Sequence, residues 1–167
     1  RDINQYKDYI LAWMLSGPYT QSGKDGPALF DVVFDPERPD AKDVKWRPVS
    51  VSEGVAVDLR QILGGENRVA YLRATVICPD ERKVTLEMGS DDGIKAWLNG
   101  EVVHANNASR GHKAGEDKVE VTLAAGSNAL LLKVVNGGTD WAASARIVGP
   151  DGNPTKGLKI VGALSAK

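Results

Sequence analysis

The chain has 167 residues, of which 42% are hydrophobic, and its 21 basic and 22 acidic side chains nearly cancel. This length is typical of one domain with its own core, and the charge balance excludes the basic excess that nucleic-acid binding requires. The single cysteine, Cys78, excludes an internal disulfide and a cysteine-based zinc site. The longest apolar run, residues 9–15, is too short to cross a membrane. We therefore expect one domain over residues 1–167, a monomer with no nucleic-acid or membrane partner.

Glycine and proline interrupt the N-terminal part of the chain. Between Gly17 and Trp46, Gly-Pro, Asp-Pro and Arg-Pro pairs predict a long loop with at most one strand, over residues 28–34. Such a segment usually covers one end or edge of a sheet. Short strands are expected around residues 46–49 and 55–59, and a longer one over residues 68–77.

Regular alternation of apolar and polar residues begins at Lys83. Val84, Leu86 and Met88 share one face of the predicted strand, whereas Lys83, Thr85 and Glu87 share the other. This pattern is typical of a half-buried strand.

Two hairpins follow. Residues 94–98 and 102–105 are joined by Asn99-Gly100, a strong signal for a two-residue turn. This turn predicts Leu98 opposite Glu101, Trp97 opposite Val102, Ala96 opposite Val103 and Lys95 opposite His104, with Trp97 on the less buried face. The second hairpin is predicted to turn at residues 126–128, and a last strand covers residues 141–148. Eight or more short strands predict an all-β fold, a two-sheet antiparallel β-sandwich of the jelly-roll type.

Two polar loops carry residue types that bind sugars. Residues 106–112 include Asn106, Asn107 and Arg110, and Asp140-Trp141 follows a glycine-containing turn. A sugar site needs an aromatic face for the pyranose ring and amides, carboxylates or arginine for its hydroxyls. If the two loops lie at the same end of the sandwich, these five residues form a carbohydrate contact region. Trp141 also opens a strand, so a place in the core is an equal alternative.

Asp91 and Asp92 stand at the turn before the first hairpin. Three interpretations are open for them. They could bond to nearby backbone amides, with Gly93 supplying an unusual backbone angle; they could begin a calcium site; or they could contact sugar directly.

Catalytic motifs are absent from the sequence. His104 and His112 have no nucleophile context, and neither a Gly-x-Ser-x-Gly elbow nor a His-Glu-x-x-His helix occurs. Neighbouring carboxylates in extended chain point to opposite faces, which does not suit the facing pair of a glycosidase. We expect a non-enzymatic domain.

Four stretches of this chain resemble a known family. They are Trp13 with Gly17-Pro18-Tyr19, residues 71–75, the run GSDDGIKAWLNGEVVH and the run LAAGSNALLLKVVNGGTDW. Their order and spacing resemble galactose-binding-like jelly-roll domains, which accompany glycoside hydrolases, polysaccharide lyases and bacterial surface or periplasmic proteins. The resemblance covers residues 10–148. The Asp91-Asp92-Gly93 segment is similar to the Asp-Asp-Gly motif of protective-antigen type lectin domains, in which the two aspartates hold calcium.

The resemblance implies a function and a location. A carbohydrate-binding module would keep a larger extracellular or periplasmic protein near a polysaccharide or oligosaccharide, with Asp91 and Asp92 as calcium ligands. The alternative is an accessory domain that packs against a neighbouring domain of the same chain and binds no sugar. The first residue is Arg, not Met, so we expect a piece of a larger protein.

Overall fold

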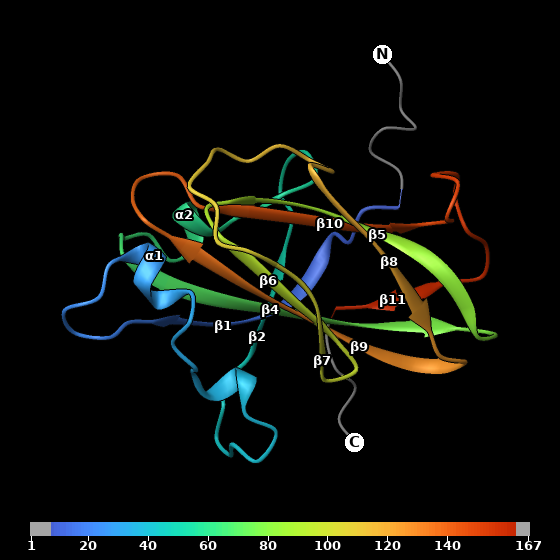
Figure 1. The fold of residues 1–167 in the computed structure, drawn as a ribbon, viewed down its shortest axis with the longest axis horizontal. Helices are drawn as coiled ribbons and strands as arrows, with labels where there is room; N and C mark the ends of the chain where they lie inside the picture. The colour runs from blue at the N-terminus through green and yellow to red at the C-terminus, as the bar shows by residue number, and fades with distance from the viewer. Residues whose placement is uncertain (1–7, 163–167) are drawn as a thin grey trace.

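Two antiparallel β-sheets pack face to face in the computed structural model, which describes residues 8–162 (Figure 1). Residues 1–7 and 163–167 of the expected domain lie outside this range. The larger sheet has the order β2 (Arg47–Ser50), β1 (Ala12–Tyr19), β4 (Arg68–Cys78), β9 (Gly126–Asn136), β6 (Ile94–Leu98) and β7 (Glu101–Asn106), and β11 (Lys159–Val161) also pairs with β4. The smaller sheet has the order β3 (Val57–Asp58), β10 (Ala142–Val148), β5 (Arg82–Asp91) and β8 (Asp117–Leu123). The predicted all-β sandwich is confirmed.

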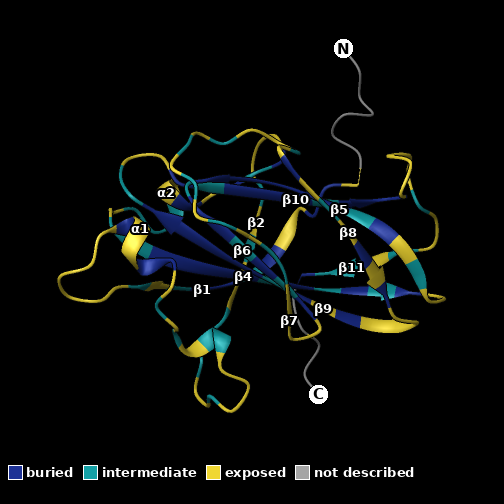
Figure 2. Cartoon of the chain, viewed as in Figure 1, coloured by how far each residue is buried: buried dark blue, intermediate teal, exposed yellow. Residues whose placement is uncertain are grey.

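The hydrophobic core lies between the two sheets, where buried residues of both inner faces meet (Figure 2). On β5, Val84, Leu86 and Met88 are buried as the alternation predicted. Glu87, predicted to face solvent, is also buried, because its carboxylate accepts a 2.9 Å hydrogen bond from Nε of Arg146 on the adjacent β10. The alternation therefore identified the inner face correctly and missed one buried ion pair on the outer face.

The β6–β7 hairpin forms at Asn99-Gly100, both of which have positive φ, as this turn requires. Leu98 pairs with Glu101 and Trp97 with Val102, as predicted. Beyond Trp97 the register shifts, so that Ala96 pairs with His104 instead of Val103, and Lys95 with Ala105 instead of His104. An irregularity of this kind adds one residue to one strand. A pairing register that is predicted from the turn alone assumes regular strands and so misses this shift.

The turn of the second hairpin comes earlier than predicted. Residues 124–125 form it, and Gly126 already begins β9. The reason is Asn128, whose fully buried side chain accepts the Ala124 N–H at 2.8 Å and donates to the Ala124 carbonyl at 2.9 Å. Its amide closes the turn from within the strand, so it is not a turn residue itself.

The long segment before β2 covers part of the outer face of the larger sheet, as Figure 1 shows for α1 (Gly26–Leu29) and η2 (Asp35–Glu37). The strand predicted over residues 28–34 is wrong. Asp25 caps α1 by accepting the Ala28 N–H at 3.0 Å, and Pro27 occupies the first turn, where its missing N–H costs nothing. The predicted covering role of this segment agrees with its position.

Only short helices occur within residues 8–162. The third, α2 (Leu59–Ile62), is capped by Asp58, whose Oδ1 accepts the Gln61 N–H at 3.1 Å. No helix in this described range has the length and apolar character needed to cross a bilayer.

Candidate functional site

Asp92 joins the two polar loops that the sequence singled out. Its Oδ1 accepts the backbone N–H of Arg110 at 3.0 Å, and its Oδ2 accepts the backbone N–H of Gly137 at 2.8 Å. Its own N–H donates to the Val135 carbonyl at 2.7 Å. Loop 106–112 and the turn before Asp140 therefore meet at one end of the sandwich, around the end of β5.

Gly93 has a steric role and no unusual backbone angle, because its φ is not positive. A Cβ at this position would lie 3.2 Å from Oδ1 of Asn107 and 3.2 Å from the Phe30 ring. The prediction that Gly93 supplies a special angle is thus wrong. The glycine is needed because loop 106–112 and the covering segment approach its backbone closely.

Asp91 is a buried carboxyl at the same end, with 8% of its surface exposed. Burial, the largest cause, together with the charge of Asp92, a hydrogen bond with Asp92 and the charge of Asp140, raises the pKa of Asp91 to about 7. The peptide bond between Asp91 and Asp92 is cis. Near neutral pH, this carboxyl is therefore close to the midpoint of its titration.

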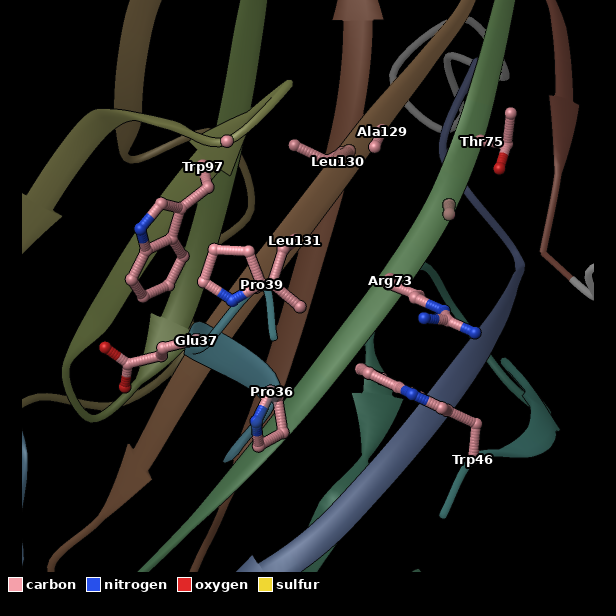
Figure 3. A pocket seen from close by; sticks show the side chains of 12 residues that line it. Pro36, Glu37, Pro39, Trp46, Arg73, Thr75, Trp97, Ala129, Leu130 and Leu131 are labelled. Atoms are coloured by element: carbon pink, nitrogen blue, oxygen red, sulfur yellow. The ribbon is translucent and has the colours of Figure 1, made fainter. Parts of the chain in front are cut away.

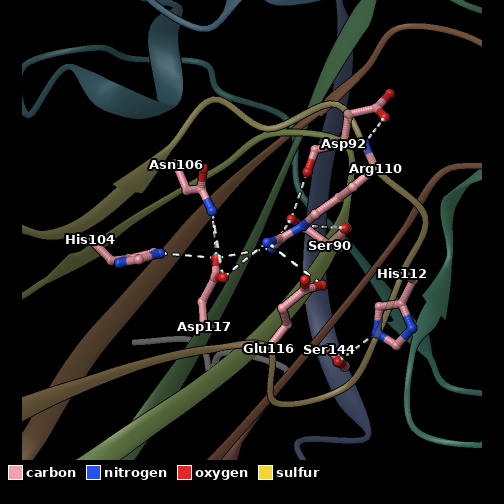
Figure 4. A network of polar contacts seen from close by, with 9 residues as sticks. All are labelled: Ser90, Asp92, His104, Asn106, Arg110, His112, Glu116, Asp117 and Ser144. Atoms are coloured by element: carbon pink, nitrogen blue, oxygen red, sulfur yellow. Dashed lines mark hydrogen bonds and ion pairs between the residues drawn. The ribbon is translucent and has the colours of Figure 1, made fainter.

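Arg110, expected to contact sugar, is bound inside a polar network of the protein (Figure 4). Its Nη1 and Nη2 each donate to one carboxylate oxygen of Asp117 at 2.9 Å, and its Nε donates to the Ser90 carbonyl at 3.1 Å. Nη2 also donates to Oγ of Ser90 at 3.0 Å. These contacts use the donors that a sugar would need, so the structure gives Arg110 the role of anchoring its loop to β5 and β8.

Asp117 is the acceptor at the centre of this network. Burial, the largest single influence, would raise the pKa of Asp117, but the hydrogen bonds from Arg110, His104 and Asn106 and the charge of Arg110 together outweigh burial. They lower its pKa to about 2. Asn106 reaches the carboxylate at 3.4 Å and His104 at 3.0 Å. Asn106 is therefore also part of the internal network and not a free sugar contact.

Trp141, expected as an aromatic platform, is only 1% exposed and belongs to the hydrophobic core. Its indole Nε1 donates to the Val134 carbonyl at 3.3 Å. A ring covered on both faces offers no surface for stacking on a sugar, so the burial alternative holds. The signal was available in the sequence, since Trp141 directly precedes the alternating residues of β10.

Asn107 and Asp140 remain exposed at this end. Asn107 donates to the Pro27 carbonyl at 3.1 Å. Asp140 forms a 2.9 Å ion pair with Arg60, and both side chains are more than half exposed, so the pair is weak. These two side chains are accessible to a ligand.

A depression of about 510 Å³ lies beside Asp91, and we call it the loop-end depression. Its lining includes four acidic residues and one histidine; the residues are Glu53, Ala56, Asp58, Asp91, Gly111, His112, Asp140, Trp141 and Ala142. Burial lowers the pKa of His112, which favours its neutral form. The depression is therefore negatively charged at neutral pH.

Glu53, Asp58 and His112 were not among the predicted site residues. Glu53 and Asp58 come from the segment around β3, which reaches the site because β3 pairs with β10. No local pattern in the sequence indicates this pairing of two-residue β3. Nε2 of His112 lies 2.7 Å from Oγ of Ser144. The loop that contains His112 was predicted to be part of the site, but His112 itself was not predicted as a site residue.

The fit of the site to calcium is partial. Asp91 and Asp92 offer adjacent carboxylates, and calcium takes six to eight oxygen ligands, which can include backbone carbonyls and ligand hydroxyls. Among residues 8–162, however, no three His, Cys, Asp or Glu side chains are grouped closely enough to hold one ion. A cation here would depend on the aspartate pair and on oxygens other than side-chain carboxylates.

No protein-family model and no curated protein matches this sequence. Solved structures do share its fold. A β-glucosidase from Kluyveromyces marxianus aligns with a TM-score of 0.52 at 14% identity, over 83% of this chain and 16% of the enzyme. An anti-sigma factor domain-containing protein aligns with a TM-score of 0.54 at 12% identity, over 92% of this chain and 46% of that protein.

A PA14 sugar-binding domain from an RTX adhesin aligns with a TM-score of 0.49 at 16% identity, over 83% of this chain and 88% of that domain. A score of this size carries no argument about function. The other two likenesses establish the β-sandwich fold and nothing about the ligand, because their identities are so low. This chain also spans less than half of either of those proteins.

Proposed function

We propose that this domain is a non-catalytic carbohydrate-binding module whose site is the loop-end depression. One observation carries the proposal. The Asp92 carboxylate holds loop 106–112 and the turn at Gly137 together, next to the acidic depression that contains Asp91. In small-molecule sites, a few precisely placed polar groups in a concave pocket fix the orientation of the ligand.

Calcium is the proposed metal, held by the carboxylates of Asp91 and Asp92. Within residues 8–162 no cationic side chain pairs with Asp91. A divalent cation would replace the proton that burial favours on this carboxyl. The bound cation would then offer open coordination positions to two hydroxyl groups of a sugar ring.

Direct contacts to the sugar are assigned to Asn107 and Asp140, the two predicted residues that remain accessible. Arg110, Asn106 and Trp141 support these loops from within the protein. Without a ring face, recognition at this end would rest on hydroxyl groups. The proposed ligand is therefore a terminal or branching sugar of a polysaccharide or oligosaccharide, bound by an extracellular or periplasmic parent protein.

Thermal unfolding of the protein tests this proposal. A ligand that binds only the folded state, at one hundred times its Kd, stabilises that state by about 2.7 kcal/mol. We expect calcium to raise the melting temperature, a matching glycan from a panel of xylan, mannan, galactan and β-glucan fragments to raise it further, and chelator to abolish both effects. Asp91→Asn should lose both shifts, whereas Glu120→Gln, at an exposed position on β8, should retain them.

Absence of any shift in a folded sample would contradict the proposal. That result would favour the alternative, a domain that packs against a neighbour. Val102 is exposed and pairs with Trp97 on the outer face of the larger sheet. An exposed apolar surface of this kind favours packing against a neighbouring domain.

A further inference from the structure

Within residues 8–162, the covering segment packs on the outer face of the larger sheet at one end. Leu29 and Phe30 of the covering segment pack there against Val69, Tyr71 and Val135 of β4 and β9. Farther along the same face the cover ends, and residues of β4, β9 and β6 line a groove of about 320 Å³, which we call the outer groove (Figure 3).

The covering segment is fixed by a buried lysine. Nζ of Lys133 donates to the Phe30 carbonyl at 2.8 Å and to the Val32 carbonyl at 2.6 Å, and it pairs with Glu37 at 2.7 Å. The Tyr71 hydroxyl donates to the same Glu37 carboxylate. The wall that η2 contributes to the outer groove is therefore held rigidly.

A row of three side chains forms the floor of the outer groove. Arg73 on β4 pairs with Leu131 on β9, and Leu131 pairs in turn with Trp97 on β6. Since neighbouring strands are about 4.8 Å apart, the Cα atoms of Arg73 and Trp97, two strands apart, are separated by roughly 10 Å. Trp46, Pro36 and Pro39 add apolar walls (Figure 3).

Arg73 is the unusual member of this row. Its guanidinium lies over the Trp46 ring at 4.1 Å, and its Nε is buried without a hydrogen-bond partner. Within residues 8–162 no carboxylate pairs with it. Glu37, the one acidic residue among those lining the groove, is already bound by Lys133 and Tyr71. A buried donor on a cation without a counter-ion costs stability.

The free polar groups of the lining side chains are mostly donors. Arg73 has its guanidinium N–H groups, Thr75 has a hydroxyl, and the indole N–H groups of Trp46 and Trp97 make no hydrogen bond within the described residues. Guanidinium recognises carboxylates through two parallel hydrogen bonds. A donor-rich, cationic groove with aromatic walls suits an oxygen-rich anion that also has an apolar face.

We propose that the outer groove binds a carboxylate-bearing sugar, a uronic acid unit of an acidic polysaccharide, with its carboxylate on Arg73 and its ring against Trp97. A peptide segment suits the groove less well, because its backbone N–H groups would need acceptors that the lining side chains do not have free. This site is separate from the loop-end depression and needs neither Asp91 nor calcium.

Titration calorimetry and the indole N–H resonances in NMR spectra test this proposal, with the whole protein in chelator. The ligands are short oligogalacturonate, oligoglucuronate and alginate fragments, and each is compared with its neutral methyl ester. We expect at least one acid to bind and to shift the indole resonances of Trp46 and Trp97. Its ester should bind at least tenfold more weakly, a difference of about 1.4 kcal/mol.

Variants separate the two proposed sites. Arg73→Gln should weaken binding of the acid at least tenfold and Trp97→Phe less strongly, whereas Asp91→Asn should leave it unchanged. Equal binding of acid and ester, loss of binding in Asp91→Asn, or no binding of any acid would overturn the proposal. Binding of a proline-rich peptide in place of the acids would make the outer groove a protein-docking site, which also overturns it.

Discussion

Replacing Asp91 by asparagine removes a buried charge while keeping the size of the side chain. The folded protein holds the pKa of Asp91 at about 7, compared with an ordinary value of 3.8. The folded state therefore binds the proton more tightly than the unfolded state, and the stability of the protein falls as the pH rises from about 4 to about 7. Above pH 7 the whole cost of the buried carboxylate is present, whereas below pH 4 none of it is.

The size of the effect follows from this difference in pKa. It corresponds to at most about 4 kcal/mol. Because the depression is open to water, which screens the charge, we expect roughly half of this, about 2 kcal/mol. For a domain of this size, this stabilisation by Asp91→Asn should raise the melting temperature at pH 8 by about 4–8 °C.

Thermal unfolding at pH 5 and pH 8, in chelator, measures this difference. The gain from Asp91→Asn should be largest at pH 8 and less than half as large at pH 5, where the folded protein carries Asp91 largely protonated but the unfolded protein has already lost that proton. Glu120→Gln removes an exposed charge and should change the stability by less than about 0.5 kcal/mol at both pH values. Destabilisation by Asp91→Asn at pH 8, or an equal gain at the two pH values, would show that Asp91 is not a costly buried charge.

Three further changes test the roles assigned to the other site residues. Arg110→Met leaves the Asp117 carboxylate buried without its main partner and should lower the free energy of unfolding, measured by chemical denaturation, by about 3–5 kcal/mol. Arg60→Met breaks only an exposed pair and should lower it by less than about 1 kcal/mol. Similar losses for the two variants would contradict the anchoring role of Arg110. Trp141→Ala should destabilise the protein by about 3–5 kcal/mol, as a core truncation does. Trp141→Phe should retain glycan binding in calorimetry. Loss of binding in a folded Trp141→Phe protein would indicate that Trp141 contacts the sugar after all. Lys133→Met should raise hydrogen exchange in residues 30–37 more than elsewhere, and a uniform increase would show that Lys133 does not specifically fix the covering segment.

The β-sandwich was predictable because its signals are local. Alternation on β5 and the Asn99-Gly100 turn follow from the period of a strand and from the backbone angles of two residues. The register shift at Ala96 leaves no signal in the sequence, and the early turn depends on the hydrogen bond between the Asn128 side chain and the Ala124 backbone, which the Gly126-Ser127-Asn128 turn signal does not show.

The sequence indicated which two loops lie together at the candidate site, but it did not indicate which of their side chains are accessible to a ligand. Both polar loops do meet, but they meet because the backbone N–H groups of Arg110 and Gly137 donate to the Asp92 carboxylate. A sequence pattern of side-chain types does not show such backbone partners. Arg110 and Trp141 were chosen by residue type alone. Residue type does not show whether a guanidinium is already paired or a ring already covered, since both depend on how the strands and loops pack together.

The outer groove was missed for the same reason. Trp46 is partly buried and lies beside Arg73, and no motif in the sequence places these two side chains together. Three strands and the covering segment must come together before these side chains become neighbours.

Carbohydrate binding at the loop-end depression can be measured by NMR titration of the protein with glycan fragments in the presence of calcium. The backbone amides of Arg110 and Gly137, which donate to Asp92, report on the site. We expect a bound glycan to shift these two amide resonances and chelator to reverse the shifts. A glycan that binds with calcium but leaves both amides unchanged, or the absence of binding by every fragment, would contradict this expectation.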